Sequence, residues 1–364
     1  MNMTEQQVVF TNDICRALTE FTTKIQHDRL FILFDTETLR YCMPLIMPFM
    51  DEYERAHGGD QIPIIIIEPT DAAKNITSLT EVWDRLSAQG ATRHSLLINV
   101  GGGMVTDLGG FAAATFKRGI SFINVATTLL GAVDAAVGGK TGINHNGLKN
   151  EVGVFAPAAA VLISSAFFDT LDRDNLLSGY AEMLKHSMLI SQSEHFYGLL
   201  EFDVINKARS EEFLSLLETS VEVKRKVVRQ DPYEQGRRKA LNLGHTFGHA
   251  FESYCMRRQQ PVLHGYAVAW GLVCEAVLSH LLCGFPTSKM NDVAQFVRDN
   301  YGVPAITCED YDELYELMTH DKKNEAGDIN FTLLRNLGDV AINQTASKEQ
   351  IGATLDIFRD LMGI

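Results

Sequence analysis

The sequence predicts an α/β domain built on a parallel sheet, followed by a mainly α-helical domain. Short, almost continuously apolar runs alternate with helical patterns in the first part of the chain, which is typical of strands covered on both faces. From about residue 164 to residue 321 the apolar spacing is almost wholly helical. A chain of 364 residues is too long for one ordinary core. We therefore expect two domains, 1–171 and 172–364, with a cleft between them.

The predicted strands of the first domain are apolar runs separated by helical or strongly apolar stretches. We expect them at 29–34, 62–67, 95–100 and 121–125. The helical part is followed by one late β-like run at 329–334. After it, Ser347-Lys-Glu-Gln350 resembles a capping box, in which two side chains satisfy the first backbone groups of a helix. A last helix should therefore begin there.

Composition favours a globular protein that binds small molecules. Hydrophobic residues make up 46% of the chain and charged residues 21%, and the net charge is −14. This negative field repels a phosphate polymer, so nucleic-acid binding is disfavoured. A small anion can still bind where a few cations converge.

Cysteine usage and hydropathy indicate a cytoplasmic protein. None of the six cysteines forms a Cys-x-x-Cys pair, and several lie in apolar runs, which favours a reducing compartment. The N-terminus lacks the basic and apolar regions of a signal peptide. The most apolar long window, Ala267 to Phe285, is interrupted by Glu275 and His280. We expect a buried helix there and no membrane span.

Two glycine-rich segments are candidates for anion binding. Val100 leads into Gly101-Gly102-Gly103 and Asp107, before a helical pattern. A strand, a glycine turn and a helix N-terminus in this order form the phosphate cradle of Rossmann-like sheets. A tight turn that binds no ligand explains the same residues about as well.

The second segment, residues 127–144, places Asp134 and Lys140 among small residues, and Lys149 and Asn150 follow. A surface loop with solvated lysines is one interpretation. A second phosphorylated ligand beside a dinucleotide is the other.

A group of histidines suggests a divalent metal. His245 and His249 are four residues apart on one helical face, and His264 follows shortly after. On another helical stretch, Glu182 and Lys185 share a face. A catalytic metal usually takes three protein ligands, and the spacing leaves open which of Glu182 and the three histidines is not one. Core histidines bonded to carbonyls are the alternative. A glycine precedes both His245 and His249 and another follows His264, which leaves room for a ligand, and the polar residues Arg238, Asn242 and Lys224 are near in sequence. These features make the alternative less favoured.

With these residues assembled, the chain resembles the 3-dehydroquinate synthases of the sugar-phosphate cyclase superfamily, from about residue 34 to residue 334. Their fold is shared with glycerol and iron-containing alcohol dehydrogenases. The motifs that carry the resemblance are Gly101-Gly-Gly…Asp107, Thr127-Thr-Leu-Leu, Val137-Gly-Gly-Lys-Thr-Gly, Lys149-Asn150, Ala181-Glu182…Lys185, Leu241-Asn-x-Gly-His-Thr-x-Gly-His-Ala-x-Glu252, Leu263-His-Gly and Asp321-Lys-Lys-Asn.

The resemblance implies a role for each group of residues. Zinc, or cobalt, would be held by Glu182, His245 and His264, which leaves His249 on the substrate side. Arg238 and Lys224 would hold a substrate carboxylate, and Asp134 and Lys185 would line the ring-forming region. The phosphate end would be surrounded by Lys140, Asn150, Asn242, His249 and Lys322 or Lys323, with Arg118 reaching in from the partner of a homodimer. NAD would contact Asp35, Asp71, Lys74, Gly101, Gly102, Gly103, Asp107, Thr127, Thr128, Lys140, Lys149, Thr170 and Leu171.

The implied substrate is a small sugar-acid phosphate, 3-deoxy-D-arabino-heptulosonate 7-phosphate. Its C5 alcohol would be oxidised, phosphate would leave by elimination, and reduction, ring opening and an aldol step would close the carbocycle of 3-dehydroquinate. This serves the shikimate pathway of aromatic amino acid biosynthesis. The alternatives are a sister cyclase forming 2-epi-5-epi-valiolone or 2-deoxy-scyllo-inosose, a simple dehydrogenase, and a non-enzymatic binding protein.

Three positions depart from the family pattern. Asp71 replaces the usual Glu of a Glu-x-x-Lys element, which affects the expected ribose contacts. Gly147-Leu148-Lys149 replaces Leu-Gly-Lys. Tyr266 replaces the Glu that usually follows His-Gly, so we expect a change in the groups that support His264.

Overall fold

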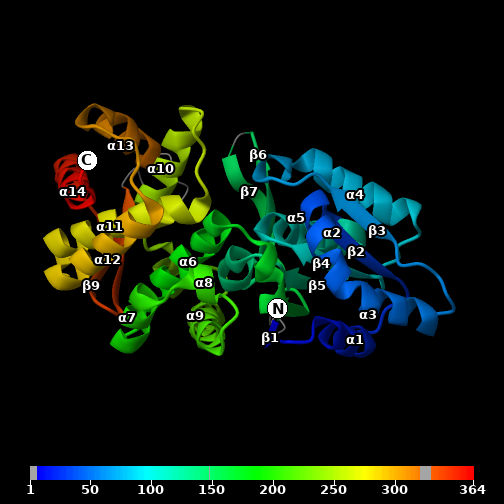
Figure 1. Cartoon of the computed structure of the whole chain (residues 1–364). Helices are drawn as coiled ribbons and strands as arrows, with labels where there is room; N and C mark the ends of the chain where they lie inside the picture. Colours follow the sequence, from blue (N-terminus) through cyan, green and yellow to red (C-terminus); the bar gives the residue numbers. More distant parts are fainter. Residues whose placement is uncertain (1–5, 147, 320–328) are drawn as a thin grey trace. The chain divides into compact units, whose positions relative to one another are not determined.

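The structure is a computed structural model that describes residues 6–146, 148–319 and 329–364. The chain divides into two compact units, Met1–Asp172 and Arg173–Ile364, each with its own core. The first unit is α/β and the second mostly helical, which confirms the predicted fold class (Figure 1).

A six-stranded parallel sheet organises the first unit, with strand order β1-β8-β5-β4-β2-β3. The four predicted runs are strands β2 to β5, and β2 and β4 are buried along their whole length. A separate antiparallel hairpin, β6–β7, packs on helix α5. The strands are Gln7–Phe10 (β1), Leu30–Asp35 (β2), Ile64–Ile67 (β3), Leu96–Gly101 (β4), Ser121–Ala126 (β5), Lys140–His145 (β6), Leu148–Phe155 (β7) and Ala160–Ile163 (β8).

Crossover connections join successive strands of this sheet, as parallel pairing requires. α-Helices form the connections from β1 to β5, and a π-helical turn and the β6–β7 hairpin lie between β5 and β8. They are Ile14–Lys24 (α1), Thr36–Tyr41 (α2), Met43–Ala56 (α3), Ile76–Ala88 (α4) and Gly103–Thr115 (α5), with a π-helical turn at Gly131–Ala135 and 3₁₀ turns at Asp71–Ala73, Phe116–Arg118 and Ser165–Thr170.

The direction of chain progress across the sheet reverses between β2 and β4. From β2 the chain moves outward to β3, then returns to the other side of β2 and continues through β4 and β5. In open parallel sheets, ligands bind beyond the carboxyl ends of the strands at such a reversal. The carboxyl ends here are Asp35 of β2 and Gly101 of β4.

The second unit is a helical bundle with one antiparallel hairpin, β9–β10. The predicted capping box is confirmed. The Ser347 hydroxyl accepts from the backbone N–H of Gln350, and the Gln350 side-chain oxygen accepts from the backbone N–H of Ser347. The elements are Arg173–Met188 (α6), Ser193–Glu201 (α7), Val204–Lys207 (α8), Glu211–Gln230 (α9), His245–Arg257 (α10), His264–Cys283 (α11), Thr287–Tyr301 (α12), Tyr311–Thr319 (α13), Asn330–Asn336 (β9), Asp339–Thr345 (β10) and Lys348–Met362 (α14), with 3₁₀ turns at Arg237–Asn242 and Cys308–Asp310.

Helix α11 lies at the centre of this unit and contacts α6, α10, α12, α14 and β9. It is the one helix among the described residues that is long and apolar enough to cross a membrane, yet 72% of its most apolar window is buried inside the protein. The expected buried helix is therefore confirmed.

Candidate functional site

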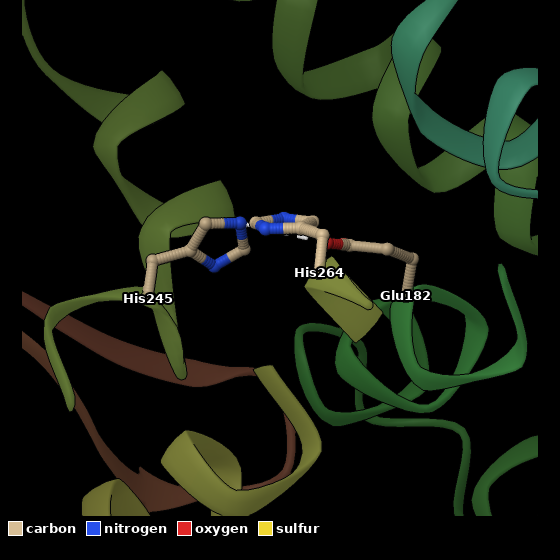
Figure 2. A group of neighbouring side chains, drawn as sticks. All are labelled: Glu182, His245 and His264. Atoms are coloured by element: carbon tan, nitrogen blue, oxygen red, sulfur yellow. Dashed lines mark ion pairs between the residues drawn. The ribbon is translucent and has the colours of Figure 1, made fainter. Parts of the chain in front are cut away.

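Three side chains from three helices converge in the second unit: Glu182 of α6, His245 of α10 and His264 of α11 (Figure 2). The Nε2 atoms of His245 and His264 lie 3.4 Å and 3.6 Å from the same oxygen, Oε1 of Glu182. One ligand atom from each residue lies within 4.8 Å of the others. Two imidazoles and a carboxylate in this arrangement are a donor set suited to zinc or a similar divalent cation.

Hydrogen bonds orient both imidazoles toward Glu182. His245 Nδ1 donates to the carbonyl of Leu243 at 3.0 Å, which leaves the lone pair of its Nε2 available to a cation. His264 Nδ1 lies 3.4 Å from Oε2 of Glu252. Burial lowers the pKa of His264, but hydrogen bonds to Glu182 and Glu252 and their charges outweigh burial and raise this pKa to about 10.

The second oxygen of Glu182 forms an ion pair with Lys185, three residues further along α6. Both side chains are buried, with exposures of 0% and 1%. A buried carboxylate is stable only when compensating charges surround it. Glu182 therefore offers one oxygen toward the histidines and the other toward a lysine, and the residues present fit a cation at the convergence point.

Close approach of α6 and α11 brings Glu182 and His264 together. A Cβ atom on Gly265 would lie 1.9 Å from the carbonyl oxygen of Ser178, so only glycine fits there. The Gly265 N–H also donates to the Ser178 hydroxyl at 3.1 Å. The glycine after His264 thus has a packing role, which the sequence pattern alone does not reveal.

His249 and Tyr266 lie beside this group. The His249 ring centre is 5.4 Å from that of His245 and 6.0 Å from that of His264. The Tyr266 hydroxyl donates to Asp174 at the start of α6, at 2.7 Å. Where the family pattern has a glutamate, this chain therefore has a side chain that links α11 to α6, while Glu252 supports His264.

The predicted substrate-side cations of this unit are mostly buried. Arg238 is 2% exposed and Lys224, on α9, is 6% exposed. The Arg238 guanidinium donates to the carbonyl of Pro232 at 2.6 Å, and Asn242 donates to Glu234 at 3.1 Å. Lys322 and Lys323 lie outside the described residues.

Most of the predicted NAD contacts follow the carboxyl ends of parallel strands in the first unit. Asp35 ends β2, and its side chain caps α2 by accepting from the Thr38 N–H at 2.7 Å. Gly101 ends β4, and α5 begins at Gly103 without a side-chain cap. The free N–H groups of such a helix start favour an anion. The remaining members of this set are Gly102, Thr127 and Thr128 after β4 and β5, and Thr170 and Leu171 in and after the turn that follows β8.

Lys74 joins three of the predicted segments. Its ammonium lies 3.1 Å from Asp107 of α5, 2.5 Å from Asn150 of β7 and 3.7 Å from Asp71. Asp71 also pairs with Lys149 at 3.3 Å. The shorter acid at position 71 thus still reaches both lysines.

The other predicted site residues of the first unit, Asp134, Lys140 and Arg118, lie in turns or at the start of a strand. Asp134 lies in the π-helical turn Gly131–Ala135, and the exposed Lys140 begins β6. Arg118 is exposed and has a φ of 70°, in the left-handed region. Gly147, part of the altered Gly-Leu-Lys sequence, lies outside the described residues.

Comparison with known proteins identifies the family to which this chain belongs. Residues 64–178 match 3-dehydroquinate synthase N-terminal, and residues 179–324 match 3-dehydroquinate synthase C-terminal. A 3-dehydroquinate synthase of Parabacteroides distasonis is 53% identical over 362 residues, covering 100% of both chains. One of Campylobacter jejuni is 38% identical over 303 residues, covering 82% of this chain and 86% of the other. The chain belongs to the 3-dehydroquinate synthase family.

Solved structures share the fold of this 3-dehydroquinate synthase family member. ValA, a 2-epi-5-epi-valiolone synthase from Streptomyces hygroscopicus with NAD⁺ and Zn²⁺ bound, superposes with a TM-score of 0.86 at 24% identity, covering 99% of this chain and 98% of that chain. A 2-deoxy-scyllo-inosose synthase gives a TM-score of 0.80 at 20% identity, covering 95% of each chain.

Two polar side chains of this 3-dehydroquinate synthase family member contact His264 or the residue after it, and the sequence had assigned a role to neither. Glu252 lies on α10 one turn after His249, but its contact with His264 depends on the packing of α10 against α11. Ser178 precedes Glu182 by one turn on α6 and accepts from Gly265. The partner of each side chain lies on another helix, so only the tertiary structure identifies these contacts.

Proposed function

We propose that this protein is a 3-dehydroquinate synthase that converts 3-deoxy-D-arabino-heptulosonate 7-phosphate into 3-dehydroquinate and phosphate, using NAD and zinc. The observation that carries the proposal is the convergence of Glu182, His245 and His264 in a chain 53% identical, over its full length, to a 3-dehydroquinate synthase. These three residues would hold the metal. When bound, zinc supplies a Lewis acid for an alcohol oxygen and NAD supplies a reversible hydride acceptor.

The residues of the second unit would bind the substrate's anionic carboxylate. Arg238 and Lys224 are cations with little exposed surface. A desolvated cation forms a strong, charge-assisted pair with a carboxylate, and such a pair orients the ligand. A substrate without a carboxylate would leave both cations without this partner, which favours the heptulosonate over sugar phosphates that carry no carboxylate.

We place NAD in the first unit, beyond the carboxyl ends of β2, β4 and β5. The reversal of strand order between β2 and β4 supports this position, as does the uncapped start of α5. The Lys74 network would hold the 71–74 turn, α5 and β7 in register around the cofactor. Lys140, Asn150, Asn242 and His249 would contact the phosphate end, with Lys322 or Lys323; Asp134 and Lys185 would line the ring-forming region.

We also propose a cytoplasmic homodimer in which Arg118 reaches the partner's substrate. The apolar side chains that β7 exposes support a second copy: Leu148, Val152, Val154 and Phe155. The six cysteines are free thiols, as expected in a reducing compartment. Light scattering on the purified chain should give twice the monomer mass, and a monomer mass at micromolar concentration would reject the dimer.

A phosphate-release assay tests the reaction. With NAD and zinc, the protein should release phosphate from heptulosonate phosphate and form 3-dehydroquinate without net accumulation of NADH. Sedoheptulose 7-phosphate and glucose 6-phosphate serve as competing substrates. Turnover of only these two would assign the chain to a sister cyclase, and stoichiometric NADH release would assign it to a dehydrogenase.

A histidine pair tests the metal ligands. His245→Ala should abolish both bound zinc and turnover in a folded protein, because it removes one of three donors. His249→Ala is the matched control on the same face of α10 and should keep the metal. Zinc per chain is measured by elemental analysis after reconstitution. Equal zinc content in His245→Ala and the unmodified protein would contradict the assignment.

A further inference from the structure

A buried carboxylate in the middle of α11 has no role in the proposed chemistry. Glu275 has an exposure of 0%. Its Oε2 accepts from the N–H of Gly244 at 2.6 Å, and its Oε1 accepts from the N–H of Thr246 at 3.1 Å. These two donors belong to the residues on either side of His245. One side chain of α11 therefore binds the backbone on both sides of a proposed metal ligand.

Helix α10 has no side-chain cap of its own at this end. Its N-cap residue is Gly244, with a φ of 80° and no side chain to accept a hydrogen bond. The first N–H groups of a helix lack partners within the helix, and the helix dipole favours an anion beside them. Glu275 supplies the missing acceptor and the negative charge from a neighbouring helix.

Glycine packing fixes the distance over which Glu275 must reach. A Cβ on Gly271 would lie 1.9 Å from the carbonyl oxygen of Gly244, so the backbones of α10 and α11 are in direct contact. Residue 275 is one turn further along the same face of α11. The Glu275 carboxylate therefore arrives at the start of α10 with little freedom to move.

The direction of the His245 ring depends on this part of the backbone. Its Nδ1 donates to the carbonyl of Leu243, and its Nε2 points to Glu182, 3.4 Å away. A rotation of the first turn of α10 would move both nitrogens. We propose that Glu275 is a positioning residue for the metal centre: by binding the N–H groups of Gly244 and Thr246, it holds His245 in the orientation that presents Nε2 to the metal. This inference rests on the proposed metal site.

Glu275→Gln tests the inference at nearly constant volume. The amide keeps one acceptor oxygen, but its NH₂ group faces the second N–H, so one hydrogen bond and the negative charge are lost. We expect a 10- to 100-fold weaker zinc affinity, as found for residues that orient metal ligands. Affinity is measured by competition with a chelator on metal-free protein. The absorption spectrum of the cobalt-substituted protein reports ligand geometry and should change as well.

Ser279→Ala is the matched control, because Ser279 lies one turn further along α11. It is buried, and its hydroxyl accepts from the N–H of Leu334 at 2.9 Å. This variant should lower the melting temperature and leave the zinc affinity and the cobalt spectrum unchanged. If Glu275→Gln does not fold, Glu275→Asp, which keeps the charge and shortens the reach, is measured in the same way.

Two outcomes would overturn the positioning role. One is a Glu275 variant with unaltered zinc affinity and cobalt spectrum. The other is an equal loss of zinc affinity in Ser279→Ala at a similar melting temperature, which would make the effect one of general stability. Failure of the unmodified protein to bind zinc would reject the proposed metal site, and is separately recognisable because no variant is needed to observe it.

Discussion

Arg238 is a buried guanidinium held by local backbone groups. Its side chain donates to the carbonyl of Pro232, and its N–H donates to the carboxylate of Asp231 at 3.0 Å. Its neighbour Arg237 is exposed. Two adjacent arginines therefore differ in solvation, and only the buried one fits strong pairing with an anionic substrate.

Arg238→Ala should weaken transition-state binding by about 2–5 kcal/mol, because a desolvated charge pair is lost. At about 1.4 kcal/mol per tenfold, this corresponds to a fall in kcat/KM of roughly 30- to several-thousand-fold. Steady-state kinetics with heptulosonate phosphate measures the effect. Arg237→Ala is the control and should change kcat/KM by less than about twofold, as expected for an exposed surface charge. Unchanged kinetics in Arg238→Ala would remove this residue from the substrate site.

Asp231 organises the turn that precedes Arg238. Its carboxylate accepts from the N–H groups of Gln235, Gly236 and Arg238 at 2.9, 2.7 and 3.0 Å. Burial raises the pKa of Asp231, but these backbone hydrogen bonds outweigh it and leave the pKa below its ordinary value of 3.8. A lowered folded-state pKa stabilises the protein above the unfolded-state pKa, and this stability is lost as the pH falls through the folded value.

Asp231→Asn should therefore reduce the free energy of unfolding at pH 7 by about 1 kcal/mol, the usual net value of such hydrogen bonds. The difference from the unmodified protein should shrink as the pH falls below 3.8, where the native carboxylate becomes protonated as well. Urea unfolding at several pH values between 7 and 3 measures both. A difference that stays constant across this range would show that the charge on Asp231 is not involved.

At the scale of elements, the crossing of α6 and α11 sets the distance between Glu182 and His264, two of the three proposed metal ligands. Gly265→Ala would force the helices apart, because the new methyl group would lie 1.9 Å from the Ser178 carbonyl. We expect a loss of stability of roughly 1–3 kcal/mol or more from this overpacking, together with weaker zinc binding. Urea unfolding and chelator competition measure the two effects.

Gly352→Ala is the control for that substitution. A Cβ at Gly352 in α14 meets no atom within 4 Å. Alanine in a helix interior is more stable than glycine by about 0.5–1 kcal/mol, so this variant should gain stability and keep its zinc affinity. Equal behaviour of the two variants would indicate that the α6–α11 contact is not sterically demanding.

The sequence predicted most accurately the strands that are buried along nearly their whole length. Strands β2, β4 and β5 are apolar runs inside a parallel sheet, and the runs predict them to within one residue. Strand β3 begins at Ile64, two residues later than expected, after Pro63, which has no N–H to donate to a ladder. The β6–β7 hairpin was not predicted, because its glycine-rich and mostly exposed residues lack a strand period.

The site was predictable where residues lie close in sequence or match a family motif. Spacing placed His245 and His249 on one helical face but left open which of four candidates is not a ligand. The structure groups Glu182, His245 and His264. Glu252 and Glu275 could not be assigned, because their partners lie on a different helix and the distances depend on how α10 and α11 pack.

At the scale of the whole molecule, NAD is proposed to bind the first unit and zinc the second. Ligands that bind the folded state slow local opening around their sites. Zinc should increase hydrogen-exchange protection in α6, α10 and α11, and NAD should increase it in the segments after β2 and β4. Mass spectrometry of exchanged peptides measures both. Two results would contradict the assignment of zinc to the second unit. One is zinc-dependent protection in the first unit alone, and the other is zinc-dependent protection of α6, α10 and α11 that persists in His245→Ala.

The central position of α11 has a consequence for synthesis. Several of its partners, α12, β9 and α14, come later in the chain. While the ribosome is still translating them, an apolar helix long enough to enter a bilayer lacks the surfaces that later cover it. Such a segment is a binding site for chaperones and a starting point for aggregation. A premature stop codon before α14 would therefore yield insoluble protein, even though every residue proposed to bind zinc had already been made.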